Sequence, residues 1–121
     1  MRQFADNVAQ VLINISNDGW FGQSAARYQH LAMVRMRAAE NRRWILRSTN
    51  DGITATIDSA GRLRGTLPLY VEATSYTGFT YIPERTPYTR YGNWFVALCA
   101  LLAAMGLLAE KTRVMATDEH G

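Results

Sequence analysis

The sequence predicts an α/β fold followed by one membrane-spanning helix, and three features carry this prediction. Apolar runs rich in β-branched residues, near 11–16 and 53–57, are bounded by turn residues, as buried strands are. Between them, residues 24–43 are dominated by Ala, Leu, Met, Arg and Glu, which favour helix. From Trp94 to Ala109 the chain carries no charge, which is typical of a helix surrounded by lipid.

Composition agrees with a folded chain and limits its chemistry. The 121 residues are 48% hydrophobic and 19% charged, which indicates a globular protein and not a disordered one. The formal charge is +3, and Lys111 is the only lysine. Arginine-rich chains suit fixed ion pairs and phosphate contacts. A single cysteine, Cys99, excludes an internal disulfide, and residues 1–6 have no apolar core of a signal peptide.

The first strand is expected at Val11–Ser16, after a short helical stretch over residues 1–9. It breaks into Asn17, Asp18 and Gly19, residue types that tolerate tight turns, and then presents Trp20 and Phe21 before Gly22. Ligands of α/β proteins bind at the carboxyl ends of strands, so this stretch is the predicted centre of a pocket. The alternative is that the two aromatic rings only close the edge of a core.

Residues 24–43 are expected to form a helix with Ser24 as its N-cap. At 100° per residue, a broad and largely apolar face includes two arginines, Arg35 and Arg42. We expect both to point inward and to pair with buried carboxylates or carbonyls. Glu40 lies three residues from Arg37 and from Arg43, which is suitable spacing for ion pairs on a helix.

A series of short strands is expected to follow. The predicted strands and their connecting turn are Trp44–Arg47, Ile53–Ile57, a hairpin turn at Asp58–Gly61, Arg62–Gly65 and Leu69–Ser75. The expected domain limits are 1–76 for the α/β part, 77–90 for a linker loop, 91–109 for the membrane helix and 110–121 for a polar tail.

The uncharged run is slightly short for a membrane span. At about 1.5 Å per residue, residues 94–109 cover roughly 24 Å of a hydrocarbon core of about 30 Å. Adding residues 91–93 brings the segment near the lower limit. Tyr91, Trp94 and Phe95 at one end are typical of an interfacial aromatic belt, and charged residues begin at Glu110. We therefore predict one transmembrane helix.

Several sequence blocks recur together, in this order, in one known family. The blocks are Asn17–Gly22 (NDGWFG), Tyr28–His30 (YQH), Arg35–Ala38 (RMRA) with Glu40, Arg47–Asn50 (RSTN), Gly52–Ala55 (GITA) and Thr86–Tyr88 (TPY). The chain resembles the bacterial apolipoprotein N-acyltransferases, which are membrane-anchored members of the nitrilase (carbon–nitrogen hydrolase) superfamily. The resemblance runs from about Arg2 to about Ala109, and it implies part of a nitrilase-type αββα sandwich followed by the membrane helix.

The resemblance also implies an activity. The family moves an acyl chain from a phospholipid donor to the N-terminal diacylglyceryl-cysteine of an apolipoprotein acceptor, through a cysteine thioester and without a metal or organic cofactor. The family's cysteine, lysine and glutamate have no match in this sequence. Cys99 lies in the apolar run, where a thiol is unreactive, and Lys111 follows the span. The chain alone is therefore expected to be inactive and to need the missing N-terminal part of the same protein.

The resemblance further implies that Trp20 and Phe21 wall the thioester site, where large aromatic rings would shape an acyl tunnel and exclude water. The predicted substrate pocket also includes Asn17, Asp18, Gly22 and His30. Asn17 and Asp18 are expected mainly to fix the turn. His30 has two interpretations, a general base or a hydrogen-bonded structural histidine, and the second is favoured because the sequence nearby contains no nucleophile.

Two other functions fit the sequence. The chain could be a fragment of a soluble nitrilase-superfamily amidase, although the apolar run argues against this. It could also be a small basic membrane-tethered binding domain without catalysis. Nucleic acid is not an expected partner, because the helical arginines are spread around the helix. The resemblance places the enzyme in the bacterial inner membrane, with the nitrilase-like domain in the periplasm. The isolated chain is expected to be poorly soluble because it would expose strand edges.

Overall fold

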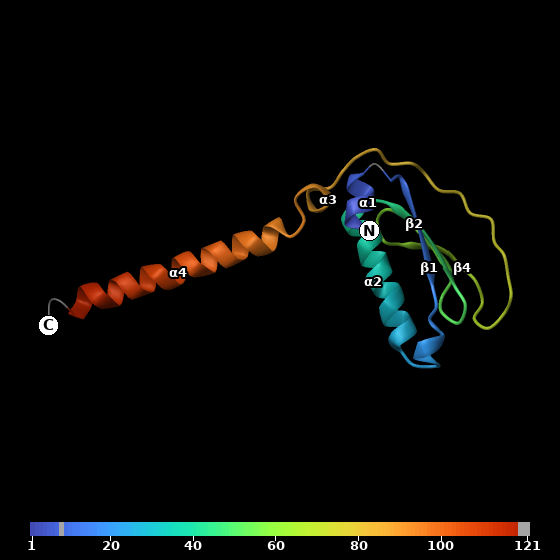
Figure 1. Cartoon of the computed structure of the whole chain (residues 1–121), viewed down its shortest axis with the longest axis horizontal. Coiled ribbons are helices and arrows are strands. Elements are labelled where there is room, and N and C mark those ends of the chain that lie inside the picture. Colours follow the sequence, from blue (N-terminus) through green and yellow to red (C-terminus); the bar gives the residue numbers. More distant parts are fainter. Residues whose placement is uncertain (8, 119–121) are drawn as a thin grey trace. The chain divides into compact units, whose positions relative to one another are not determined.

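The computed structural model describes residues 1–7 and 9–118 (Figure 1). The chain divides into two units, residues 1–90 and residues from Tyr91 onward. The elements of the first unit, including the short helix that ends it, are α1 (Arg2–Asp6), β1 (Val11–Ser16), the 3₁₀ helix η1 (Gly19–Phe21), α2 (Ala26–Asn41), β2 (Trp44–Thr49), β3 (Ala55–Ile57), β4 (Leu63–Thr66) and α3 (Pro87–Tyr91). The second unit contains α4 (Trp94–Asp118).

The first unit is built on a four-stranded sheet whose strand order, β1-β2-β3-β4, follows the chain. β1 and β2 are parallel, with Val11 opposite Trp44 and Ser16 opposite Thr49, and α2 makes the crossover between them. β3 and β4 are added by antiparallel pairing. The mixed sheet and its crossover helix confirm the predicted α/β class.

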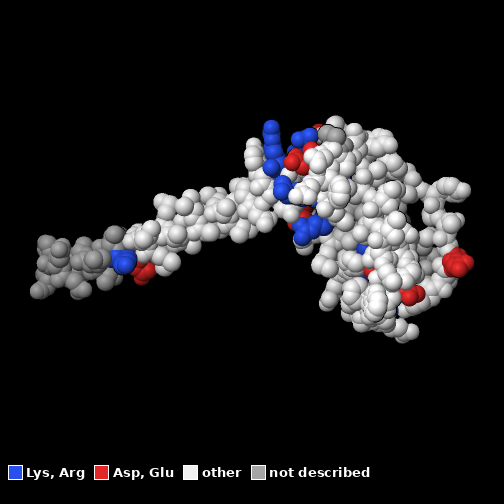
Figure 2. Space-filling model, viewed as in Figure 1, with Lys and Arg blue, Asp and Glu red and all other residues white. Residues whose placement is uncertain are grey.

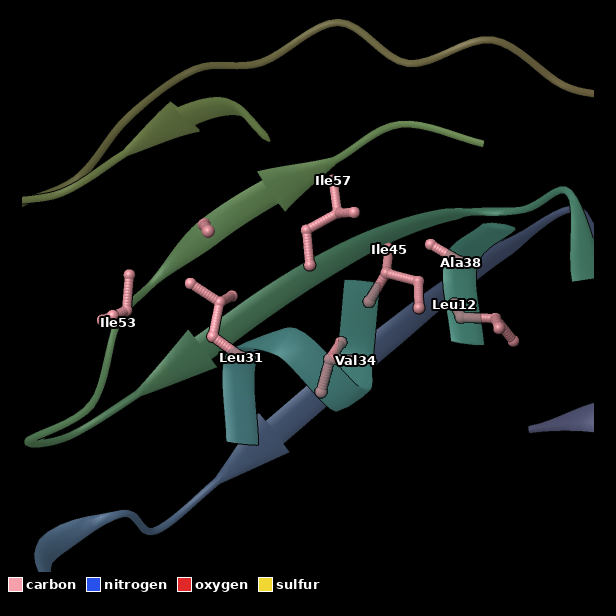
Figure 3. Packing of buried hydrophobic residues seen from close by; sticks show 8 residues of the cluster. Leu12, Leu31, Val34, Ala38, Ile45, Ile53 and Ile57 are labelled. Atoms are coloured by element: carbon pink, nitrogen blue, oxygen red, sulfur yellow. The ribbon is translucent and has the colours of Figure 1, made fainter. Parts of the chain in front are cut away.

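The core lies between α2 and one face of the sheet. Leu31 and Val34 of α2 point toward Ile45 and Ile57 of the strands (Figure 3). The spacing of Leu31, Val34 and Ala38 puts them on one side of the helix, which explains why a helix with so many charged residues still packs on a sheet.

The opposite face of β1 is apolar and uncovered. Ile13 is 70% exposed and Ile15 is 82% exposed, whereas Leu12, which precedes them, is buried in the core. Among the described residues β1 pairs only with β2, so its other edge has no strand partner. Ile13 also lines a hollow of about 410 Å³ on this face, together with residues of β2–β4 and the segment 73–77. β1 therefore has an edge without a strand partner among the described residues and an uncovered apolar face.

Most predicted strands are present, with one clear error. β1 has the predicted bounds, β2 extends to Thr49, and the turn at 58–61 and the returning strand β4 are formed. The predicted strand Leu69–Ser75 is wrong, because residues 69–70 form a turn in which Tyr70 has φ 60°, and the chain has no regular structure from there to Thr86. A left-handed residue breaks the extended backbone that the alternating pattern suggested.

The ends and the arginines of α2 also differ from prediction. Ser24 is not the N-cap, because α2 begins at Ala26 and the Ser24 hydroxyl donates to the Phe21 carbonyl instead. Arg35 and Arg42 do not point inward: both are exposed, and their partners are the Gly61 carbonyl and the exposed Glu84.

The buried arginines of this segment are Arg27, in the first turn of α2, and Arg43, just after the helix ends. Arg42 has φ 48°, and this left-handed residue turns the chain so that Arg43 enters the core. The ion pair Arg37–Glu40 is formed at 2.7 Å, whereas Arg43 donates to backbone carbonyls and not to Glu40. One of the two ion pairs predicted for Glu40 is therefore confirmed.

The turn between β3 and β4 is organised by Asp58. Its buried carboxylate accepts hydrogen bonds from the backbone N–H groups of Ala60 and Arg62 and from the side chains of Arg62 and Arg64. Burial alone would raise the pKa of Asp58, but these hydrogen bonds favour the carboxylate more strongly and lower the pKa to about 2.

We predict that Asp58→Asn lowers the free energy of unfolding by about 2 kcal/mol at pH 7. Because the folded pKa is below the unfolded one, this stabilisation is complete above about pH 4 and is lost as the pH falls through about 2. Urea unfolding of the detergent-solubilised chain, followed by circular dichroism, measures the difference. Glu72→Gln, which removes an exposed carboxylate, is the control and should change little at any pH.

The second unit contains the predicted apolar helix, which is longer than expected. α4 begins at Trp94 and continues past Ala109 to Asp118, and its segment Trp94–Lys111 is long and apolar enough to cross a membrane. The first part of the predicted polar tail is thus helical, and residues 119–121 of that tail lie outside the described residues.

Candidate functional site

Polar side chains gather where β1 and β2 end. Because the two strands are parallel and Ser16 is opposite Thr49, the loops that follow them, 17–22 and 50–52, lie next to each other. This is the edge of a parallel sheet at which ligands usually bind. The sequence-predicted site residues of the first loop therefore meet a second loop that the prediction did not include.

Two asparagines join these loops. The Asn17 side-chain oxygen accepts hydrogen bonds from the Gly19 backbone N–H (3.0 Å) and from the Asn50 amide (2.7 Å). The Asn50 side-chain oxygen in turn accepts from the Asp18 backbone N–H at 3.0 Å. The prediction that Asn17 fixes the turn is confirmed, and Asn50 extends the restraint to the neighbouring strand.

Asp18 has a second role besides the one predicted for it. Its carboxylate is buried and accepts from the Ser16 hydroxyl (2.7 Å), His30 Nδ1 (3.0 Å) and Arg47 Nη2 (2.5 Å). The Asp18 backbone carbonyl also accepts from the Phe21 N–H at 3.0 Å, so Asp18 fixes the turn through its own backbone as predicted. Its side chain in addition connects the loop to α2 through His30 and to β2 through Arg47.

Arg47 completes a buried network. Besides Asp18, its guanidinium donates to the Asn14 side chain (2.6 Å) and to the Ile53 carbonyl (3.2 Å). The side chains of both Arg47 and Asp18 are fully buried, so the two charges neutralise each other away from water. Removing either partner would leave the other charge buried and uncompensated, which is the costly case.

The network keeps Asp18 ionised. Burial alone would raise the pKa of Asp18, but the hydrogen bond from Ser16, the charge of Arg47 and the contact with His30 outweigh burial and hold the pKa below its usual value. Asp18 is therefore a permanent acceptor near neutral pH. His30 Nδ1 lies 3.0 Å from this carboxylate and 3.3 Å from Arg47 Nη2.

Trp20 and Phe21 are presented on the outside of this network. They lie in η1, where Trp20 is 89% exposed and Phe21 is 38% exposed. The rings of Phe21 and His30 pack in a T-shaped arrangement, with centroids 5.8 Å apart and planes at 79°. Asp18, His30 and Phe21 thus form one continuous chain of contacts, which orients the Phe21 ring.

Gly22 ends the loop in a left-handed conformation, with φ 52°. Its carbonyl accepts a hydrogen bond from Arg27 Nη2. Arg27 also donates to the Tyr70 hydroxyl at 2.5 Å, and its guanidinium lies 5.4 Å from the centre of the Tyr70 ring. The far end of the loop is therefore fixed to the segment after β4.

Sequence reasoning missed three residues that hold the loop from outside it, which are Ser16, Arg27 and Arg47. The available signal was the position of Arg47 within an apolar strand, because a buried arginine needs an anionic partner. The first unit contains neither cysteine nor lysine. Among the described residues no group of three or more His, Cys, Asp or Glu side chains is placed to hold a metal ion. The site offers aromatic surface and hydrogen bonds but no thiolate.

Gly52 is required by the close approach of Asp18. A Cβ at position 52 would lie 2.1 Å from Asp18 Oδ2 and 2.7 Å from Asp18 Cγ. We predict that Gly52→Ala displaces the carboxylate and lowers the free energy of unfolding by about 3 kcal/mol, the upper end for overpacking. Urea unfolding checks the value. Gly65→Ala, where a Cβ meets nothing within 4 Å, is the matched control, and equal losses in both variants would contradict the prediction.

Comparison with known proteins finds one matching protein family and several relatives of similar sequence. A family model described as carbon-nitrogen hydrolase matches residues 1–82. The chain is 42% identical over 111 residues to an apolipoprotein N-acyltransferase of Pseudomonas putida, which covers 88% of the chain and 22% of that protein. It is 42% identical over 113 residues to that of Azotobacter vinelandii, with 90% and 22% covered, and 44% identical over 102 residues to that of Nitrosomonas europaea, with 84% and 20% covered. The chain spans about a fifth of the length of these curated relatives.

Proposed function

Because the chain belongs to the carbon–nitrogen hydrolase family, whose model matches residues 1–82, we propose that it supplies part of the acyl-binding pocket of an apolipoprotein N-acyltransferase. In this proposal the complete protein transfers an acyl chain from a phospholipid to the N-terminal diacylglyceryl-cysteine of a lipoprotein. The relatives of that name, about 40% identical over most of this chain, support the assignment.

One observation carries the proposal: two large aromatic side chains are exposed on a loop that is rigidly fixed from beneath. Trp20 is almost fully exposed, yet the residue two positions before it, Asp18, is buried in an ion pair. A loop that only closed a core would bury its aromatic rings. A loop that forms the wall of an acyl tunnel needs its aromatic rings in fixed positions, because a flexible wall would admit water.

The proposed chemistry requires groups on another part of the protein. There, a cysteine thiolate attacks the phospholipid ester carbonyl, forming a thioester and releasing the lysophospholipid. The lipoprotein amine then attacks the thioester carbonyl and restores the thiolate. Trp20 and Phe21 would line the acyl chain in both steps and keep water away, since a wet thioester hydrolyses. Asn17, Asp18, Gly22 and His30 would hold these two rings in place.

The first unit has an uncovered side on which the part of the protein that carries the reactive groups could pack. β1 has an unpaired edge among the described residues, and Ile13 and Ile15 project from its uncovered face. We propose that the preceding part of the full-length protein adds a strand to this edge and packs a second sheet on this face, forming the αββα sandwich. On this proposal the α/β unit extends through residue 76, residues 77–90 connect it to the membrane helix, and the reactive groups reside on the added half.

α4 would anchor the enzyme in the membrane. Its segment Trp94–Lys111 has the length and composition of a span, and Trp94 and Phe95 at its start fit an interfacial belt. We propose that the protein resides in the bacterial inner membrane with the first unit on the periplasmic side, where the lipid donor and the lipoprotein acceptor meet. No cofactor takes part in the proposed reaction.

A chimeric enzyme tests the proposal. Residues 1–121 would replace the homologous segment of the Pseudomonas putida apolipoprotein N-acyltransferase, and mass spectrometry of lipoprotein N-termini would distinguish two acyl chains from three. We expect the chimera to restore the third acyl chain in cells depleted of their own enzyme. A chimera that is produced and inserted at the normal level, but leaves lipoproteins with two chains, would contradict the proposal.

A further inference from the structure

A second cluster of charged side chains lies at the other end of α2 from Trp20. Figure 2 shows that most of the cationic surface visible on the first unit gathers at one end of it. We define the arginine end as the charged residues that belong to the segment 84–90 or hydrogen-bond with it. These are Arg2, Arg37, Arg42, Arg43, Arg85 and Arg90, with the carboxylates Asp6, Glu40 and Glu84. Cations therefore outnumber anions at this end by three.

Arg43 is the centre of this cluster and its charge is not neutralised. The side chain is buried, and it donates to the carbonyls of Ala9 (2.7 Å), Glu84 (2.7 Å) and Arg42 (3.1 Å). Within the described part of the chain no carboxylate lies close enough to form a salt bridge with it. Burial and the nearby charge of Arg85 lower the pKa of Arg43. A negatively charged group close to Arg43 would therefore be electrostatically favourable.

Two of the three carboxylates at the arginine end, Glu84 and Asp6, bind weakly. Arg42 contacts Glu84 at 3.2 Å and Arg85 contacts Asp6 at 3.4 Å, and all four side chains are more than a third exposed. Exposed pairs of this kind contribute little because water competes for both partners. An incoming anion with several oxygen acceptors could exchange with the carboxylates at little cost. Phosphate is such an anion, and guanidinium groups bind it through two parallel hydrogen bonds.

The covalent chain limits how far this cluster can be from a membrane. Arg90 precedes Trp94, the first residue of the candidate span, by four positions, so their Cα atoms lie within about 14 Å of each other. Thr89 is buried in the first unit and accepts from Arg2 through its carbonyl at 3.1 Å, so the segment is fixed to that unit. If α4 spans a bilayer, as the proposed function requires, Arg90 lies within about 14 Å of the start of that span.

We infer that the arginine end binds the phosphates of anionic phospholipid headgroups and so fixes the first unit on the bilayer surface. This inference rests on the membrane anchoring in the proposed function and adds a lipid-recognition surface separate from the acyl pocket. Each cationic side chain near an anionic surface contributes enough attraction for roughly a fivefold change in association. The partial pairing with Asp6, Glu40 and Glu84 reduces this, so an overall preference of about fivefold for anionic lipid is expected.

Spin-labelled lipids measure this preference directly. The full chain is reconstituted in phosphatidylcholine vesicles with a trace of spin-labelled phosphatidylglycerol or spin-labelled phosphatidylcholine, and electron spin resonance gives the fraction of each label immobilised by protein. The variant Arg42→Gln/Arg85→Gln removes two exposed charges from the arginine end. The control Arg62→Gln/Arg64→Gln removes two exposed charges that instead contact Asp58. Lys111, beyond the apolar segment, is the same in all three proteins.

We expect the parent chain and the control to prefer the phosphatidylglycerol label about fivefold and the Arg42/Arg85 variant to prefer it less than about twofold. Raising the salt to 1 M should reduce the preference of the parent, since the screening length falls to about 3 Å. Equal preference in the variant and the parent, or an equal loss in the control, would overturn the inference. Displacement of the label by inorganic phosphate, but not by chloride of equal ionic strength, would show that the ligand is the free anion and not a lipid.

A failure of this inference can be distinguished from a failure of the proposed function. A chain that carbonate extracts from the vesicles has no membrane anchor, and that outcome would overturn both the anchoring and this inference. A chain that stays inserted but shows no lipid preference would overturn this inference alone. The acyl-transfer proposal would then still be judged by the chimera.

Discussion

Replacing Trp20 and Phe21 together by alanine in the chimeric enzyme is expected to lower N-acylation about 100-fold, the loss typical when reacting groups are displaced by about 1 Å. Without the two rings the acyl chain would have no fixed wall, and water would reach the thioester. Hydrolysis should therefore account for a larger share of the turnover. Release of free fatty acid and formation of triacylated lipoprotein, measured in the same reaction, report this change.

The exposure of Trp20 separates the effect of this ring on acylation from any effect on folding. A side chain that is 89% exposed stabilises the isolated fold little, so Trp20→Ala should change the free energy of unfolding by less than about 0.5 kcal/mol. Phe4→Ala removes an exposed aromatic ring from α1 and is the matched control, expected to leave acylation unchanged. A double variant of Trp20 and Phe21 that acylates normally would mean that the rings do not form the pocket.

Breaking the buried ion pair should have the largest effect on stability. Asp18→Asn leaves the Arg47 guanidinium buried without a countercharge, and Arg47→Met leaves the Asp18 carboxylate in the same state. Each change is expected to lower the free energy of unfolding by about 3–5 kcal/mol. Because Asp18 also orients His30 and the loop, both variants should in addition lose acylation in the chimera.

The double variant Asp18→Asn/Arg47→Met distinguishes a coupled pair from two separate residues. Its loss should be smaller than the sum of the single losses by about 2 kcal/mol, because no isolated charge remains. Urea unfolding in detergent measures all three. The pKa of Asp18 is lowered in the folded chain, so its stabilisation is present above about pH 4 and is lost as the pH falls below that value. Additive losses would contradict the coupling.

Local patterns in the sequence predicted the elements well. The β-branched run before Asn17 specifies a strand by itself, and β1 has the predicted bounds. The uncharged run after Asn93 likewise specifies a helix start at Trp94. The error at residues 69–75 shows the limit of such patterns, because alternation of polar and apolar residues predicts a strand only if a neighbouring strand is available to pair with it.

The site was harder to predict because its partners are distant in sequence. The loop residues Asn17 and Asp18 could be identified from turn chemistry, but Arg47 is 29 positions from Asp18 and Asn50 is 32 positions away. Helical periodicity pointed to Arg35 and Arg42 as the inward arginines. For Arg42 it failed because this residue ends the helix in a left-handed conformation, and periodicity does not continue past a helix end. The pocket assigned to Trp20 and Phe21 stays a prediction.

The order of strands in the sheet has a consequence for how the protein is made. Each strand pairs with the one synthesised just before it, so the sheet can grow in one direction as the chain leaves the ribosome, without waiting for a distant partner. The side of the sheet that is completed last is β4, whereas the proposed function pairs the open edge of β1 with residues translated earlier. On that proposal we expect nascent β1 to dock on an already folded template, with α4 emerging after the sheet.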